Sequence, residues 1–164
     1  MIANEAVILG TFGKSFKMDR MTWIKPSFLW MMYRSGWATK DGQNRILAID
    51  MKRDGFDYIV NNAVLSSYSA EAYGSHEEWK EKLQGTEVRC QWDPERDIYG
   101  NPLNQRTIQL GIKGSMSHKY VHDWIIKLTD ITQNVIDIKE AIEGKTFTKA
   151  MLPIENKYTI HIDK

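Results

Sequence analysis

Residues 20–38 read RMTWIKPSFLWMMYRSGWA and hold three of the six tryptophans and three of the eight methionines. The first part alternates around Trp23, which predicts a short strand. Lys25 precedes Pro26, and a residue before proline favours extended backbone. We therefore expect a helix with Pro26 at its first position, where the missing N–H costs nothing. We expect Gly36 to end the helix as a C-terminal cap in the left-handed conformation.

The start of this helix is a candidate anion site. The first turn of a helix leaves N–H groups free at the positive end of the helix dipole. Lys25 adjoins this turn, Ser27 lies in it, and Arg20 reaches it from the strand, while Arg34 stands at the far end of the helix. A phosphate or carboxylate suits this arrangement. In the alternative interpretation the aromatic residues, Trp23 among them, form core and the cations meet solvent.

Composition limits the class of protein. A length of 164 residues predicts a single domain over 1–164, with a core over about 1–144 and an extension over 145–164. The hydrophobic fraction of 42% supports a packed core. A net charge of +1 excludes a global basic field, so a local patch must meet any anionic partner. The single cysteine predicts a cytoplasmic protein, and no apolar run is long enough to predict a membrane partner.

Strands and helices mix along the chain without regular βαβ alternation. This order favours the α+β class, with a mixed or antiparallel sheet packed with several helices. Hydrophobic spacing and turn residues predict helices over 3–10, 56–64, 75–83, 117–128 and 130–144, strands over 45–52, 87–92, 106–112 and 158–162, a turn over 93–96, and a loop over 98–104.

The segment 91–96 is a second constellation. Asp93 and Glu95 lie two residues apart on the predicted turn, where paired carboxylates suit acid–base chemistry or bind a ribose hydroxyl pair. Gln91 lies just before them. In the alternative, Asp93 bonds its own backbone, which is a common role of aspartate in turns.

Arg106 and Gln109 form a third constellation on the strand over 106–112. Gln109 lies opposite the apolar face of this strand, where an amide either lines a cleft or meets water. His118 and His122 share a helix face, but a zinc site needs three or four protein ligands, so we expect no metal. Val88, Cys90 and Trp92 alternate on one face, which predicts three core residues.

Four segments together resemble a known family, and they read RMTWIKPSFLWMMYRSGWATK, VRCQWDPERD, RTIQLGIKG and YVHDWIIKLTDIT. The chain resembles the bacterial and fungal family described as domain of unknown function 4291, over nearly its whole length to about Thr132. The resemblance implies a family and no mechanism. It also implies that relatives carry a further strand and helix start before Met1, so we expect this chain to lack the family's usual N-terminal segment.

The order of the first elements is also similar to that of ADP-ribosyltransferase-like domains. That likeness implies NAD as cofactor, bound in a cleft of a split sheet, with a Glu or Gln on a later strand. It assigns Gln109 to the later strand, and Arg20 and Lys25 to the pyrophosphate. The basic or His residue of the first strand would fall in the missing segment.

Three hypotheses follow. The first is an NAD-using ADP-ribosyltransferase-like enzyme with a cationic phosphate-binding cleft. The second is a non-catalytic module that binds single-stranded nucleic acid or a phosphorylated ligand through the loop aromatics Trp37, Tyr68, Tyr73 and Tyr99. The third is a structural or partner-binding domain, in which the absent N-terminal strand leaves a Trp/Met surface and an unpaired strand edge exposed. The sequence predicts no oligomeric state. The candidate catalytic residues are Gln109 and Glu95, and the candidate binding residues are Arg20, Trp23, Lys25, Ser27, Arg34, Gln91, Asp93 and Arg106.

Overall fold

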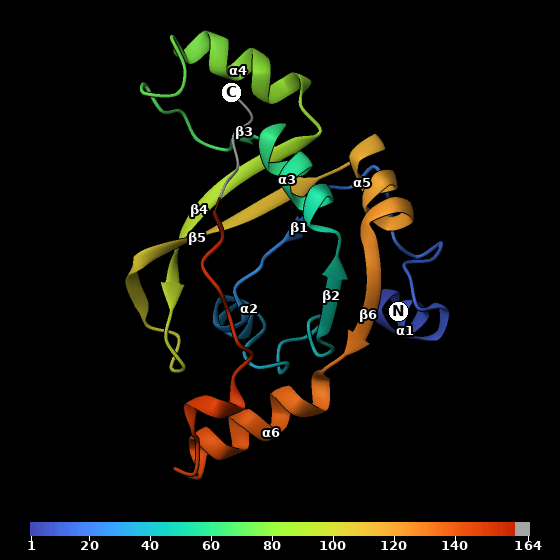
Figure 1. Cartoon of the computed structure of the whole chain (residues 1–164), viewed down its shortest axis with the longest axis vertical. Helices are drawn as coiled ribbons and strands as arrows, with labels where there is room; N and C mark the ends of the chain where they lie inside the picture. Colours follow the sequence, from blue (N-terminus) through green and yellow to red (C-terminus); the bar gives the residue numbers. More distant parts are fainter. Residues whose placement is uncertain (160–164) are drawn as a thin grey trace.

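The computed structural model describes residues 1–159, and its strands form two sheets (Figure 1). Sheet A has the order β1 (Thr22–Ile24), β5 (Pro102–Ile112), β4 (Val88–Arg96) and β3 (Val64–Leu65). Sheet B pairs β2 (Leu47–Met51) with β6 (Ile125–Asp130). All neighbours are antiparallel except β3 and β4. The α+β class and the mixed sheet are therefore confirmed.

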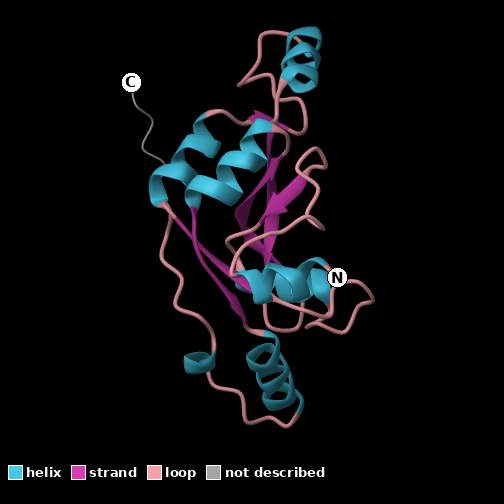
Figure 2. Cartoon of the chain, turned by 90° about the vertical axis from the view of Figure 1, so that its right-hand side faces the viewer, coloured by secondary structure: helices cyan, strands magenta, loops and turns pink. Residues whose placement is uncertain are grey.

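Helices surround the two sheets and extend beyond them. In both views α4 lies at one end of the long axis and α6 at the other, with the strands between them (Figure 2). No helix within residues 1–159 has the length and apolar character needed to cross a bilayer. The helices are α1 (Ile2–Leu9), α2 (Phe28–Ser35), α3 (Arg53–Asn61), α4 (His76–Gly85), α5 (Ser115–Lys119), a π-helix (Tyr120–Trp124), α6 (Thr132–Glu143) and a 3₁₀ turn (Lys149–Met151).

The main core lies on one face of sheet A. Val88, Leu110 and Ile112 are fully buried there, and they pack with Ile59 of α3 and with side chains of α5 and the π-helix. Each such side chain contributes about 1.5–3 kcal/mol through burial. A second cluster joins α2 to α6 through Met32, Ile46 and Val135. Because the main core takes one face of sheet A, the polar residues of its strands lie on the other face.

The predicted turn over 93–96 is wrong. Strand β4 continues through Arg96, and the turn lies at 97–101, where the Asp97 carboxylate accepts the Tyr99 and Asn101 amides. Strand β5 accordingly begins within the predicted loop. Pro94 is tolerated because β3 pairs with β4 only much earlier in the strand, and the register shifts just after the proline.

The predicted helix over 117–128 is also wrong. It stops early, and residues 125–130 form strand β6, which pairs with β2. A short apolar run fits a strand or a buried helix equally well, and the tertiary pairing decides between them. The next helix begins at Thr132 with Ile131 as its N-cap, two residues later than predicted, and the Asp130 carboxylate accepts the Thr132 amide at 3.0 Å.

Several smaller predictions can be compared with the structure. Helices at 3–10 and 75–83 are confirmed as α1 and α4, and Gly36 ends α2 in a left-handed conformation. Helix α2 begins two residues after Pro26, because Ser27 is the N-cap. Trp92 does not lie in the core, since its side chain is 41% exposed. Residues 158 and 159 form no strand, and the rest of the predicted strand over 158–162 lies outside the described residues.

Ser27 and Ser75 are the N-caps of α2 and α4, and comparing them tests what holds α2 in place. The Ser27 hydroxyl accepts the Trp30 amide and donates to the Glu95 carboxylate at 2.6 Å, and the residue is buried. The Ser75 hydroxyl accepts the Glu78 amide in an exposed cap. We expect Ser27→Ala to lower the free energy of unfolding by about 2 kcal/mol and Ser75→Ala by about 1 kcal/mol, measured by urea denaturation. Equal losses would mean that the bond to Glu95 adds nothing.

Candidate functional site

The site begins with the polar face of sheet A. Gln91 and Asp93 are alternate residues of β4, so their side chains share a face. Their partners across the ladder are Gln109 and Thr107 of β5. The register therefore places two amides side by side, with a carboxylate next to them, on the face opposite the core.

Lys25 reaches this face from the end of β1. Its ammonium donates to the Asp93 carboxylate and to the Thr107 carbonyl, both at 3.1 Å, and it lies 4.5 Å from the centroid of the Trp30 ring. The Lys25 side chain is 1% exposed. Burial lowers the pKa of Lys25, and the hydrogen bond and charge of Asp93 oppose that shift. The charge of Lys25 is thus held in place by Asp93 and by the Trp30 ring.

Asp93 also fixes the two glutamines. The amide nitrogen of Gln91 donates to Asp93 at 2.8 Å, and that of Gln109 donates to Asp93 at 2.9 Å. An ionised carboxylate only accepts hydrogen bonds, so each amide must turn its nitrogen inward and its oxygen away. Among the described residues, neither amide oxygen has a hydrogen-bond partner. The site therefore offers two oriented acceptors.

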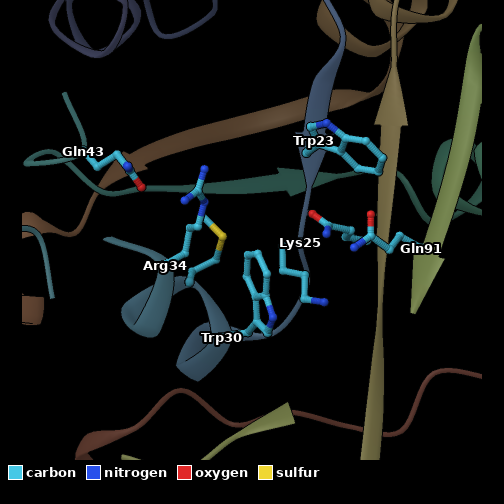
Figure 3. A pocket seen from close by; sticks show the side chains of 8 residues that line it. Trp23, Lys25, Trp30, Arg34, Gln43 and Gln91 are labelled. Carbon is cyan, nitrogen blue, oxygen red and sulfur yellow. The ribbon is translucent and has the colours of Figure 1, made fainter. Parts of the chain in front are cut away.

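A pocket of about 430 Å³ lies over this network. In Figure 3, Arg34 and Gln43 lie on one side of it and Gln91 on the other, with the rings of Trp23 and Trp30 nearby. Within residues 1–159, the Arg34 guanidinium forms no ion pair. Since Lys25 is already paired with Asp93, Arg34 carries the uncompensated positive charge of the pocket.

Gly111 sets the place of the Trp23 ring. The two residues are paired between β5 and β1, and a Cβ at Gly111 would lie 3.0 Å from the Trp23 ring and 2.7 Å from the sulfur of Met21. A side chain at this position would therefore require both Met21 and Trp23 to shift. The Trp23 ring can approach the sheet closely here because this position has no side chain.

The sequence prediction identified part of this pocket. Five candidates line it, namely Trp23, Lys25, Arg34, Gln91 and Gln109, and Asp93 connects three of them. Trp30, Met31 and Gln43 were missed. The first two were interpreted as helix core, and Gln43 follows an Asp-Gly turn that carries no sign of a binding role.

Other candidates lie elsewhere. Arg20 is an exposed residue before β1, and the Arg106 guanidinium donates to the Trp92 carbonyl at 3.0 Å. Glu95 bonds to Ser27, and both line a second cavity instead of this pocket. The structure therefore does not bring Glu95 together with Gln109.

The start of α2 meets carboxylates of the chain itself. The Phe28 amide donates to Glu155 at 2.8 Å, and the Ser27 hydroxyl donates to Glu95. The anion expected at this helix start is thus supplied by a residue far away in the sequence. No local pattern around Glu155 indicates this contact, because it depends on how a later segment crosses the fold.

The loop aromatics do not form one surface. Trp37 packs on Phe28, with ring centroids 6.1 Å apart, and the Tyr73 hydroxyl accepts the Leu65 amide. Tyr68 lies against other rings, with its centroid 5.2 Å from that of His76 and 6.2 Å from that of Trp79. Tyr99 projects furthest, with its side chain 74% exposed.

His118, His122 and Cys90 are the remaining candidates for metal binding or nucleophilic chemistry. The rings of His118 and His122 stack with centroids 6.0 Å apart. Within the described part of the chain, no group of three His, Cys, Asp or Glu side chains is placed to hold a metal ion. Cys90 is buried as predicted, and burial raises the pKa of its thiol to about 11.

The fold and the pocket together define an α+β protein with a polar, aromatic-lined pocket on one sheet face. The family model described as Domain of unknown function (DUF4291) matches residues 1–158, and the chain belongs to that family. No curated protein and no solved structure matches the chain.

The Lys25–Asp93 pair gives a stability test. Asp93→Leu leaves a buried ammonium without its partner, so we expect a loss of about 3–5 kcal/mol in the free energy of unfolding. In the double variant Lys25→Met/Asp93→Leu no charge is left unpaired, and we expect a smaller loss than for Asp93→Leu alone. Urea denaturation of both variants and of Lys25→Met measures the coupling. Additive losses would contradict a direct interaction between the two side chains.

The same pair predicts a pH dependence. In Asp93→Asn the attraction that opposes burial is removed, so the pKa of Lys25 in the folded protein falls further below its ordinary value of 10.5. Between those two pKa values the unfolded chain binds more protons than the folded chain. The variant should therefore gain stability as pH rises through that window, relative to the wild type. Urea denaturation at a series of pH values checks this, and parallel profiles would contradict it.

Proposed function

We propose that the pocket binds a nucleotide and that the protein is an ADP-ribosyltransferase-like enzyme that uses NAD. The observation that carries this proposal is the Asp93 network, which holds the amide nitrogens of Gln91 and Gln109, two residues that line a pocket bordered by tryptophan rings. Amide oxygens accept hydrogen bonds from hydroxyl groups, and aromatic rings stack on bases.

Each part of a nucleotide has a matching group in the pocket. The ribose hydroxyls donate to the glutamine oxygens, and a base or nicotinamide ring stacks on Trp23 or Trp30. Arg34 is the cation for a phosphate, because its guanidinium is free of any described ion pair and binds phosphate oxygens in a fork. The volume of about 430 Å³ lies in the range of small-molecule sites.

The proposed reaction breaks the bond between C1′ of the ribose and the nicotinamide nitrogen. Nicotinamide leaves with the bonding electron pair, positive charge develops at C1′, and an acceptor nucleophile forms the new bond and loses its proton. In this scheme Gln109 holds a ribose hydroxyl and orients the sugar. A dipole that points its oxygen toward the ribose stabilises the developing charge.

Binding is tested by the melting temperature with NAD and with ADP-ribose. A ligand at about 100 times its dissociation constant adds about 2.7 kcal/mol of stability, so a clear upward shift is expected for the wild type. Arg34→Ala should lose about tenfold or more in affinity, as expected for removal of a charge-assisted bond to phosphate. Arg20→Ala is the matched control, because Arg20 is exposed and does not line the pocket. No shift with either ligand in the wild type would overturn the proposal.

Catalysis is tested by nicotinamide release. We expect Gln109→Ala to reduce release by about 10²-fold, the order seen when one oriented catalytic dipole is removed. Gln105→Ala is the control, since Gln105 lies on the same strand outside this pocket. Shifts with both ligands but no nicotinamide release from the wild type would instead favour the non-catalytic module that binds a phosphorylated ligand.

A further inference from the structure

Residues 152–159 cross the molecule without regular secondary structure. In Figure 1 this segment leaves the α6 end, passes α2, and runs toward α3. It forms no ladder hydrogen bonds with either sheet in the described structure. Side chains therefore hold it, at two separate points.

The first point is the start of α2. A carboxylate oxygen of Glu155 accepts the Phe28 amide at 2.8 Å. This amide is one of the N–H groups that a helix leaves free at its positive end, so a negative charge is favoured there. Glu155 itself is exposed.

The second point is on α3. The Tyr158 ring meets Phe56 edge-on at a centroid distance of 5.0 Å, and the Arg53 guanidinium lies 4.8 Å from the Tyr158 centroid. The Tyr158 hydroxyl bonds to the Asp57 carboxylate, and burial together with this bond raises the pKa of Tyr158 to about 12. Arg53 also donates to the Thr159 carbonyl at 3.0 Å. Residues of α3 therefore contact the ring and the hydroxyl of Tyr158 and the backbone carbonyl of Thr159.

The groove that holds residues 152–159 contains space that this segment does not fill. A cavity of about 610 Å³ lies between the segment and walls that include Trp92, Ile108 and Met51. Ile154 does not fill this space, since its side chain is 93% exposed. A segment with a purely structural role would be expected to place its apolar side chain against apolar walls.

We propose that this groove binds an extended peptide that carries a glutamate three residues before a tyrosine, and that residues 153–159 occupy it as an internal competitor. The helix start selects the carboxylate, and the Phe56, Arg53 and Asp57 cluster selects the tyrosine. When the segment leaves, it releases the contacts of two side chains, Glu155 and Tyr158, and of the Thr159 carbonyl, and a peptide of the same chemistry replaces them. The inference stands apart from the nucleotide proposal, because none of these contacts lies in the other pocket.

Competition within one chain predicts how binding changes on mutation. A tethered segment has an effective concentration in the millimolar range, so it suppresses binding of a free peptide. Glu155→Ala/Tyr158→Ala removes the side-chain contacts of the segment at both points, keeps the contact between Arg53 and the Thr159 carbonyl, and leaves the groove residues intact. The variant should therefore bind the peptide more tightly than the wild type does.

The experiment uses the full chain and a fluorescently labelled peptide of sequence PIENKYT. Fluorescence anisotropy should show at least tenfold tighter binding to Glu155→Ala/Tyr158→Ala than to the wild type. The peptides PIQNKYT and PIENKFT should each bind that variant several-fold more weakly than PIENKYT. Ile154→Ala is the matched control in the same segment, and it should bind like the wild type.

A folded double variant that binds PIENKYT no better than the wild type would overturn the proposal, as would equal binding of all three peptides. Circular dichroism establishes that the variant is folded. Should it not fold, the wild type is titrated with unlabelled PIENKYT at millimolar concentration and the Phe28 amide is followed by NMR. A saturable shift of that amide with PIENKYT but not with PIQNKYT supports the groove, and no shift overturns it.

Discussion

The buried pair of Lys25 and Asp93 is the constraint on which the site depends. A buried ammonium is tolerated only with a partner, so β1, which delivers Lys25, and β4, which carries Asp93, must lie on either side of β5 in this register. The carboxylate in turn receives the amides of Gln91 and Gln109. One electrostatic requirement therefore fixes the arrangement of three strands and the orientation of two polar side chains. The pocket is polar because the sheet must satisfy this charge.

The same pair separates two cavities. Lys25 lies in the wall of the smaller pocket, while Thr107, whose carbonyl accepts a bond from Lys25, borders the larger one. Helix α2 contributes to both, through Arg34 near its end and Ser27 at its cap. A displacement of α2 would therefore alter both spaces together. Met32 and the second cluster, which join α2 to α6, oppose such a displacement.

Features that depend on neighbouring residues could be predicted from the sequence. Contacts between residues far apart along the chain could not. The caps at Ser75 and Gly36 follow from short-range patterns, and the alternation in β5 gave the polar face of Gln109. Pro94 suggested a turn because a proline in a strand is allowed only where one side of that strand lacks a partner. Here β5 pairs with Pro94 on one side and β3 ends earlier on the other, which the sequence does not state. The apolar run at 125–128 has no periodicity that distinguishes a strand from a helix. Glu155 lies 127 residues from Phe28, and nothing local links them.

Gly111 has a consequence for how the smaller pocket can vary. Its missing side chain leaves the space that the Met21 sulfur and the Trp23 ring approach, and Trp23 lines the pocket. A methyl group there would require the Met21 side chain to move and the Trp23 ring to shift by a few tenths of an ångström. The pocket can therefore vary through Arg34 or Gln43 without the shift that a side chain at Gly111 would impose on Trp23.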